Sequence, residues 1–230
     1  AYAPSDETQV WFFAETPGTM NNGHSVWKYK YLSGDGSGSN GIWENKQNGL
    51  PTDNCVGFFN FNFGQVNTQS SYDICVAVHP IDTQLVFIGG TNSYRTTDGF
   101  TNSSNSRWIG GDTCDFSDLK NYVYPNQHPD QHGIYFHPAD PNKMISINDG
   151  GVYECNDFII PDTLSWIDLN NGYITTQFYT VAMEQGQTTS DIVIGGMQDN
   201  GTWFTNTTEL DSAWVEINRG DGSYCAIPEG

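Results

Sequence analysis

Residues 132–169, HGIYFHPADPNKMISINDGGVYECNDFIIPDTLSWIDL, contain the clearest structural pattern in the chain. Four short segments rich in apolar and β-branched residues are separated by turn-forming residues, which is typical of β-strands. The tightest turn is Asn148-Asp-Gly-Gly151, because Asn, Asp and Gly suit the positive φ angles of a hairpin. The pattern predicts four antiparallel strands, at residues 133–138, 143–147, 152–155 and 164–168.

The same order of four segments recurs on both sides of this stretch. Upstream the segments are 74–80, 84–88, 93–96 and 107–109, and downstream they are 178–183, 191–194, 202–205 and 213–217. The N-terminal region supplies three segments, 10–14, 25–31 and 42–44, and the C-terminus supplies only a first segment, 223–228. Repeats of about 40–50 residues with four short strands each are the signature of β-propeller blades.

Aromatic residues recur in register with these segments. The third segment carries Trp27, Tyr94, Tyr153 and Trp203, and the fourth carries Trp43, Trp108, Trp166 and Trp214. A β-sandwich has no reason to repeat a Trp at one position of each unit, so the pattern favours the propeller. The composition agrees, since 25 Gly and 22 Asn stand against 7 Leu and 5 Lys. We therefore expect an all-β fold, a β-propeller of four-stranded antiparallel blades.

The repeats also predict boundaries along the chain. We expect a partial blade at 1–50, an insertion at 51–71, blades at 72–120, 131–170 and 177–218, and the first strand of a further blade at 221–230. The insertion contains Phe58, Phe59, Phe61 and Phe63, which we expect to pack against the rim, with a part in a binding face as the alternative. Because both ends cut through a blade, the chain is either a fragment of a larger propeller or a four-bladed ring closed by its C-terminal strand.

Charge and hydropathy exclude two classes of partner. Lys plus Arg is 8 and Asp plus Glu is 27, which gives a formal net charge of −19. Such a charge argues against binding nucleic acid or an anionic membrane through bulk electrostatics. The longest apolar run is Val10–Ala14, so no segment is long enough for membrane insertion. The acidity is typical of the solvated surface of a secreted or outer cell-surface protein.

The five cysteines are Cys55, Cys75, Cys114, Cys155 and Cys225. No C-x-x-C pair is present, so a structural zinc site is not expected. An odd count in an extracellular chain allows two disulfides and one leftover thiol, and the alternative is a set of buried free thiols.

The candidate site residues lie at one predicted end of the sheets. In a propeller, the loop that enters a first strand and the turn that joins strands two and three open on the same face. Loops 128–132 and 220–222 and turns 148–151 and 198–201 occupy these positions. We therefore expect Asp130, Asp149, Asp199 and Asp221 as catalytic candidates at one mouth of the channel, with His128, His132, Asn148, Gln198 and Asn200 as binding residues.

Three interpretations of these carboxylates remain open. They could act as general acid and base on a glycosidic bond, they could hold Ca²⁺ through oxygen ligands, or they could only form tight turns. No other cofactor is expected, because no nucleophilic triad, phosphate-binding loop or dinucleotide motif is present. Pro129 forbids a helix that would place His128 and His132 on one face, so we expect hydrogen bonds from them to Asp130 or to substrate.

Two sets of motifs resemble a known family. Tyr94-Arg-Thr-Thr-Asp-Gly-Phe-Thr101 resembles the Asp-box (BNR) repeat S-x-D-x-G-x-T-W, with Thr96 and Asp98 in the Ser and Asp places, Phe100 replacing the Gly, and the Trp arriving late as Trp108. This resemblance implies a folding turn between strands three and four.

The runs 128–132, 148–151, 198–202 and 220–222, together with Trp27-Lys-Tyr-Lys-Tyr31, are similar to the secreted BNR/sortilin-like propeller proteins of Bacteroidota. The similarity covers nearly the whole chain. It implies a longer protein that uses type IX secretion, of a kind often labelled glycosyl hydrolase, and for this reason we favour the fragment.

Our leading hypothesis is a secreted or cell-surface propeller that binds a glycan or an extracellular protein through its acidic face. Binding leads because no acid/base pair can be singled out among the aspartates. The alternatives are a glycoside hydrolase that uses paired carboxylates and a structural component of a surface assembly.

Overall fold

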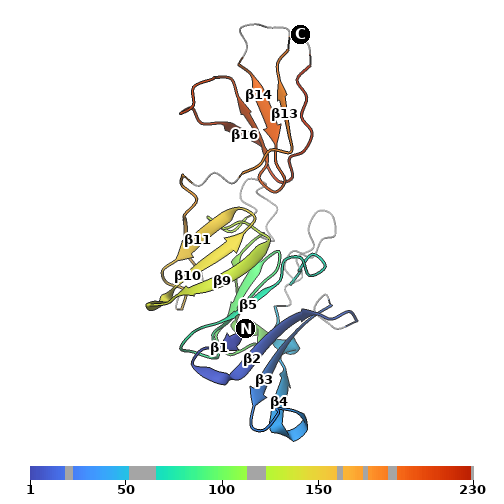
Figure 1. The fold of residues 1–230 in the computed structure, drawn as a ribbon, viewed down its shortest axis with the longest axis vertical. Coiled ribbons are helices and arrows are strands. Elements are labelled where there is room, and N and C mark those ends of the chain that lie inside the picture. The colour runs from blue at the N-terminus through green and yellow to red at the C-terminus, as the bar shows by residue number, and fades with distance from the viewer. Residues whose placement is uncertain are drawn as a thin grey trace. The chain divides into compact units, whose positions relative to one another are not determined.

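The computed structural model describes residues 1–18, 23–51, 66–112, 123–159, 163–172, 176–185 and 191–228 (Figure 1). In these residues the strands form four sheets, each with four antiparallel strands in which every strand pairs with its neighbour in sequence. The predicted all-β fold of four-stranded antiparallel blades is confirmed.

The first two sheets lie in the N-terminal half of the chain. Sheet 1 contains β1 (Tyr2–Ala3), β2 (Asp6–Glu15), β3 (His24–Tyr31) and β4 (Gly41–Asn45), and sheet 2 contains β5 (Cys75–Val78), β6 (Val86–Gly89), β7 (Ser93–Thr96) and β8 (Ser106–Gly110). Short 3₁₀ helices, η1 (Gly38–Asn40), η2 (Gln47–Gly49) and η3 (Ser103–Asn105), lie in their connections.

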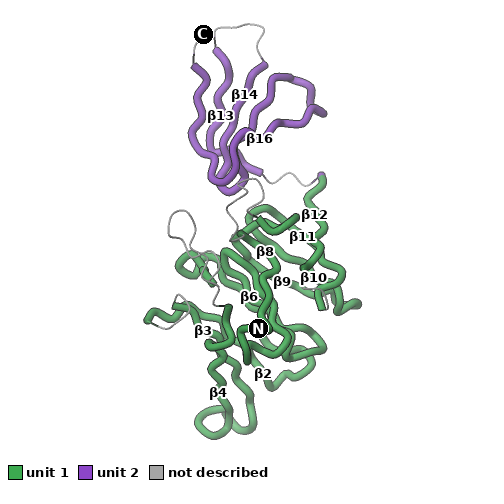
Figure 2. The backbone as a smooth tube through the Cα atoms, turned by 180° about the vertical axis from the view of Figure 1, so that it is seen from behind, with its two compact units in different colours: residues 1–171 green, residues 172–230 purple. Residues whose placement is uncertain are grey.

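The other two sheets follow in the same order. Sheet 3 contains β9 (Gln131–His137), β10 (Asp140–Asn148), β11 (Gly151–Cys155) and β12 (Trp166–Asp168). Sheet 4 contains β13 (Thr180–Met183), β14 (Val193–Gly196), β15 (Thr202–Thr205) and β16 (Val215–Asn218). The chain divides into two compact units, and each is described by itself: unit 1, residues 1–171, holds sheets 1–3, and unit 2, residues 172–230, holds sheet 4 (Figure 2).

In unit 1 the first strands of the three sheets are neighbours. Strand β5 contacts both β1 and β9. This is the arrangement of propeller blades, in which the first strand of each blade lies innermost. The loops that precede β5 and β9 are consequently brought close to each other, which positions the candidate site.

Strand β6 forms the centre of unit 1, and all four of its residues are buried. Side chains alternate across a strand, so Val86 and Ile88 face sheet 1 while Phe87 faces sheet 3. Val86 and Ile88 pack in a cluster with Trp11 and Val26 of sheet 1. Phe87 packs in a second cluster with residues of sheet 3. The continuous apolar run of β6 is thus explained by burial on both faces.

Two predicted elements differ from the structure. The N-terminal region was expected to supply three strands, but Tyr2–Ala3 adds a short fourth, held by hydrogen bonds between Ala1 and the backbone of Trp11 at 2.6 and 2.8 Å. The expected first strand at 223–228 is not formed. The side-chain hydroxyl of Thr180 donates to the carbonyl of Ser223 at 2.6 Å and accepts from the amide of Cys225 at 3.2 Å. These backbone groups therefore bond a side chain instead of the backbone of a neighbouring strand.

The described cysteines contain no disulfide. Cys75, Cys155 and Cys225 are free thiols. Two disulfides need four of the five cysteines, so the prediction of two disulfides does not agree with the structure. Cys55 and Cys114 lie outside the described residues, as do the four phenylalanines of the predicted insertion.

The turn at Thr96 and Asp98 joins β7 to β8, which are strands three and four of their sheet. Asp98 accepts hydrogen bonds from the Thr96 hydroxyl at 2.9 Å, from the backbone amides of Thr101 and Asn102 at 3.1 and 3.0 Å, and from the side-chain amide of Asn105 at 2.8 Å. The carboxylate therefore organises the whole connection, although the family resemblance stays a prediction.

We expect Asp98→Ala to lower the free energy of unfolding by about 1–3 kcal/mol, because several amide and hydroxyl donors lose their acceptor. Asp98→Asn, which keeps one oxygen acceptor, should lose less. Urea unfolding followed by tryptophan fluorescence measures both. Equal losses for the two variants would mean that the carboxylate does not organise the turn.

Candidate functional site

The loop before β9 is held in place by backbone contacts with the β6–β7 turn. The amide of Asp130 donates to the carbonyl of Thr91 at 3.0 Å, and the amide of Gln131 donates to the carbonyl of Gly90 at 2.8 Å. Asp130 has a φ of 63°, in the left-handed region that Asp tolerates better than most residues. These constraints place the Asp130 carboxyl at the inner end of β9.

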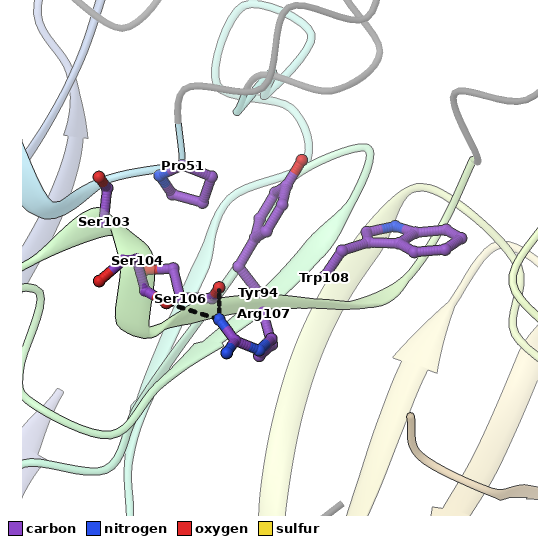
Figure 3. A pocket seen from close by; sticks show the side chains of 7 residues that line it. All are labelled: Pro51, Tyr94, Ser103, Ser104, Ser106, Arg107 and Trp108. Atoms are coloured by element: carbon purple, nitrogen blue, oxygen red, sulfur yellow. Dashed lines mark hydrogen bonds between the residues drawn. The ribbon is translucent and has the colours of Figure 1, made fainter. Parts of the chain in front are cut away.

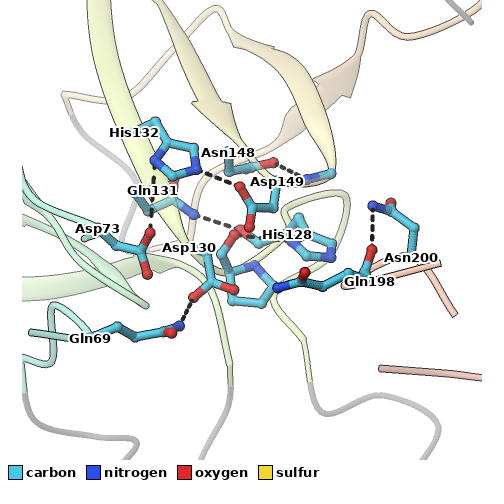
Figure 4. A network of polar contacts seen from close by, with 12 residues as sticks. Gln69, Asp73, His128, Asp130, Gln131, His132, Asn148, Asp149, Gln198 and Asn200 are labelled. Atoms are coloured by element: carbon cyan, nitrogen blue, oxygen red, sulfur yellow. Dashed lines mark hydrogen bonds and ion pairs between the residues drawn. The ribbon is translucent and has the colours of Figure 1, made fainter. Parts of the chain in front are cut away.

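The loop before β5 brings a second carboxyl to the same place. The backbone amide of Asp73 donates to the carbonyl of Thr68 at 3.0 Å. Gln69, in the same loop, donates from Nε2 to Oδ1 of Asp130 at 2.6 Å (Figure 4). The Asp73 side chain is fully buried, no amide or hydroxyl group of the described residues donates to its carboxyl oxygens, and it interacts with the carboxyl of Asp130.

The β10–β11 turn contributes a third carboxyl. Asn148 accepts the amide of Gly150 on its Oδ1 at 3.0 Å, which shapes the turn and places Asp149 at its tip. Asp149 bonds Nε2 of His132, while Nδ1 of His132 lies 3.8 Å from Oδ1 of Asp73 (Figure 4). His132 therefore lies between the buried carboxyl and the partly exposed one.

Burial and like charge dominate the electrostatics of this cluster. Burial raises the pKa of Asp73 to about 7, and the neighbouring Asp130 charge adds to the effect. Burial is also the largest cause of the raised pKa of Asp130. Burial, followed by the charge of Asp130, raises the pKa of Asp112 to about 6. These carboxyls hold protons at a pH where surface aspartates are ionised.

The structure brings together the predicted site residues of unit 1. The hydrogen-bond partner of His132 is Asp149 rather than Asp130, and a carboxylate oxygen of Asp130 lies within 4.8 Å of one of Asp149. His128 Nδ1 contacts the carbonyl of Pro129 at 3.0 Å. Asn148 is buried and its side chain bonds that of Gln127, so in this structure it stabilises the turn.

The predicted residues of unit 2 form their own turn. The backbone amide of Asp199 donates to Oδ1 of Asp221 at 3.2 Å, and both the backbone and side-chain amides of Asn200 donate to the carbonyl of Gln198, at 2.7 and 3.3 Å. Tyr179 donates its hydroxyl to the side chain of Gln198. Asp221 here caps a backbone amide, the turn-forming role that the sequence left open. That all four aspartates share one opening stays a prediction.

Sequence reasoning missed three members of the cluster, Gln69, Tyr72 and Asp73. A signal for Asp73 was present, because it precedes the first segment of its blade just as Asp130 precedes that of the next. Tyr72 is 73% exposed, and its ring stands edge-on to His132 with a centroid distance of 5.8 Å. No repeated motif marks Tyr72 or Gln69.

Two hollows are lined by residues that do not belong to this cluster. One, of about 370 Å³, is formed by outer strands β7 and β8 and the segments beside them; it is lined by Pro51, Tyr94, Ser103, Ser104, Ser106, Arg107 and Trp108 (Figure 3). The other, of about 470 Å³, lies within unit 2 and includes Met183, Leu210 and Trp214 in its lining. Neither contains a predicted site residue.

Comparison with known proteins gives structural neighbours only. No protein-family model matches the chain, and no curated protein matches it. A GH74 xyloglucanase from Xanthomonas campestris is 15% identical with a TM-score of 0.47, over 97% of this chain and 29% of that one. A GH74 enzyme from Niastella koreensis is 14% identical with a TM-score of 0.45, over 98% of this chain and 36% of that one. The chain thus spans about a third of the length of these structures, and such values assign it no family or activity.

Within the described residues, no helix is both long enough and apolar enough to cross a bilayer.

Proposed function

We propose that the protein is an extracellular glycan-binding propeller, and that it binds through a surface made by Tyr72, His132 and Asp149, here called the Tyr72 surface. The observation that carries the proposal is the exposed Tyr72 ring standing edge-on to His132, which in turn bonds the partly exposed Asp149. An aromatic ring, an imidazole and a carboxylate are thereby presented to solvent from three separate loops or strands.

This combination suits a sugar. The carboxylate of Asp149 can accept hydrogen bonds from sugar hydroxyls, and a His132 ring nitrogen can donate or accept. The exposed ring of Tyr72 offers an apolar face to the C–H groups of a pyranose. Asp73 is fully buried and Asp130 is 9% exposed, so these two side chains lie behind the Tyr72 surface and do not contact the glycan.

Glycoside hydrolysis is the second candidate function. The raised pKa of Asp130 favours it, because a general acid must keep its proton at the working pH. A hydrolase also needs a second carboxyl across the scissile bond, and Asp149 is the partly exposed carboxyl in the network. Binding ranks first because Asp130 must become more accessible before it can reach a glycosidic oxygen.

A glycan array followed by titration calorimetry tests the proposal. We expect saturable binding to one class of glycan, and at least a tenfold weaker Kd for Tyr72→Ala and for Asp149→Asn. The matched control is Tyr224→Ala, which removes another highly exposed tyrosine, 91% accessible, from unit 2. Binding confined to proteins, or equal losses in all three variants, would contradict the proposal. Release of reducing ends that disappears in Asp130→Asn would establish the hydrolase instead.

A further inference from the structure

We propose that Asp130 and Asp149 are ligands of one divalent, oxygen-preferring cation, Ca²⁺, and that Asp73 supplies the third negative charge of this site. The site goes beyond glycan binding, because it can be loaded and measured with no glycan present. Three features of the structure support it.

The first feature is the spacing of the two ligands. A carboxylate oxygen of Asp130 and one of Asp149 lie within 4.8 Å of each other. Two oxygens that share a Ca²⁺ at about 2.3–2.6 Å each are at most about 5 Å apart. The two side chains therefore meet at a separation that one ion can bridge without any change of the backbone.

The second feature is the state of Asp73. Its side chain is fully buried, no amide or hydroxyl group of the described residues donates to its carboxyl oxygens, and it faces the carboxyl of Asp130. Figure 4 shows the Asp73 carboxyl directed toward His132 and the other two aspartates, with the His132 Nδ1 atom 3.8 Å away, beyond hydrogen-bond distance. A buried carboxyl that faces a second carboxyl and has no amide or hydroxyl donor is costly, and a cation beside it would supply the missing counter-charge.

The third feature is the chemistry of the donors. Oxygen ligands dominate the cluster, and Nε2 of His132 is already bonded to Asp149. Hard cations such as Ca²⁺ and Mg²⁺ bind oxygen, whereas Zn²⁺ and Cu²⁺ take imidazole and thiolate. Ca²⁺ accepts irregular sets of six to eight oxygens, while Mg²⁺ demands near-ideal octahedral geometry and dehydrates reluctantly. Ligands from two separate loops, completed by water, suit Ca²⁺ better.

Titration calorimetry of the EDTA-treated chain with CaCl₂, in about 150 mM salt to screen diffuse counter-ion binding, tests the site directly. We expect one site per chain, Ca²⁺ at least tenfold tighter than Mg²⁺, and at least a tenfold loss of Ca²⁺ affinity for Asp130→Asn and for Asp149→Asn. Asn suits the left-handed backbone at position 130, so the first variant keeps the fold. If Asp130→Asn does not fold, the Ca²⁺ affinity of Asp149→Asn, a change at a partly exposed position, tests the proposal by itself.

The matched control is Asp211→Asn, which removes the same charge from an exposed position in unit 2. Its Ca²⁺ affinity should equal that of the original chain. Ca²⁺ could instead bind weakly to many sites, with the same affinity in all three variants. The acidic chain would then attract counter-ions only, and the proposal would be wrong. A calorimetric titration that shows no heat of Ca²⁺ binding, or equal affinities for Ca²⁺ and Mg²⁺, would also overturn the proposal. Because no glycan enters the experiment, a failure here leaves the proposed glycan binding standing.

Discussion

Asp73→Asn is expected to raise the melting temperature at about pH 8 in EDTA by roughly 5 °C or more. At this pH the Asp73 carboxyl is forced to ionise inside the protein, where it has no hydrogen-bond donor and lies near the charges of Asp130 and Asp149. Asn has nearly the same shape but no charge, so the variant removes the penalty. Differential scanning calorimetry measures the change.

The pH dependence follows from the direction of the pKa shift. The pKa of Asp73 rises from 3.8 to about 7 on folding, so the folded state binds the proton more tightly than the unfolded state. The resulting stability is fully present below about pH 4 and is lost as the pH rises through 7. It amounts to something on the order of a few kcal/mol. The advantage of Asp73→Asn should therefore grow from about pH 5 to pH 8.

Two comparisons make this prediction specific. Asp211→Asn removes an exposed charge and should show no such pH-dependent gain. Adding Ca²⁺ should shrink the gain at about pH 8, because a bound cation would stabilise the ionised Asp73 of the original chain. A variant that is less stable than the original at every pH would show that Asp73 is held by interactions that the structure does not contain.

The order of the strands could be predicted from sequence because each blade repeats one local pattern. The segments 93–96 and 202–205 coincide with β7 and β15, since turn residues bound them closely on both sides. The two-residue β1 was missed because so short a strand has no periodicity, and its position depends on contacts with Trp11. The segment 223–228 has the periodicity of a strand, but its contacts run through the side chain of Thr180.

The candidate site was predictable only where a motif marked it. Asp130, His132 and Asp149 lie at loop positions that the blade topology brings together, and the structure places them in one network. Asp73 has the same position before β5, but no histidine or glycine motif surrounds it. Its significance depends on full burial between two loops, and burial is a property of the packed blades rather than of local sequence. Periodicity can place a residue at the end of a strand, but it cannot show that water is excluded there.

Phe87→Ala is expected to lower the free energy of unfolding by about 3–5 kcal/mol, the usual loss for a phenylalanine removed from a packed core. Phe87 is fully buried, and its ring lies 5.5 Å from the rings of both Phe136 and Phe158. Phe12→Ala is the matched control, because Phe12 is 43% exposed and its ring lies 5.4 Å from that of Trp43. It should cost less than about 1 kcal/mol. Urea unfolding followed by tryptophan fluorescence measures both.

The expected form of the transition tests the blade packing itself. Because β6 of sheet 2 presents Phe87 to sheet 3 and Ile88 to sheet 1, this one strand contributes to both core clusters of unit 1. Loss of Phe87 should therefore shift the unfolding of unit 1 as a whole, with coincident curves from fluorescence and circular dichroism. Equal losses in Phe87→Ala and Phe12→Ala would contradict this packing. Separate transitions for the individual sheets would show that each blade is stabilised on its own, and the loops before β5 and β9 would then lack a common rigid support.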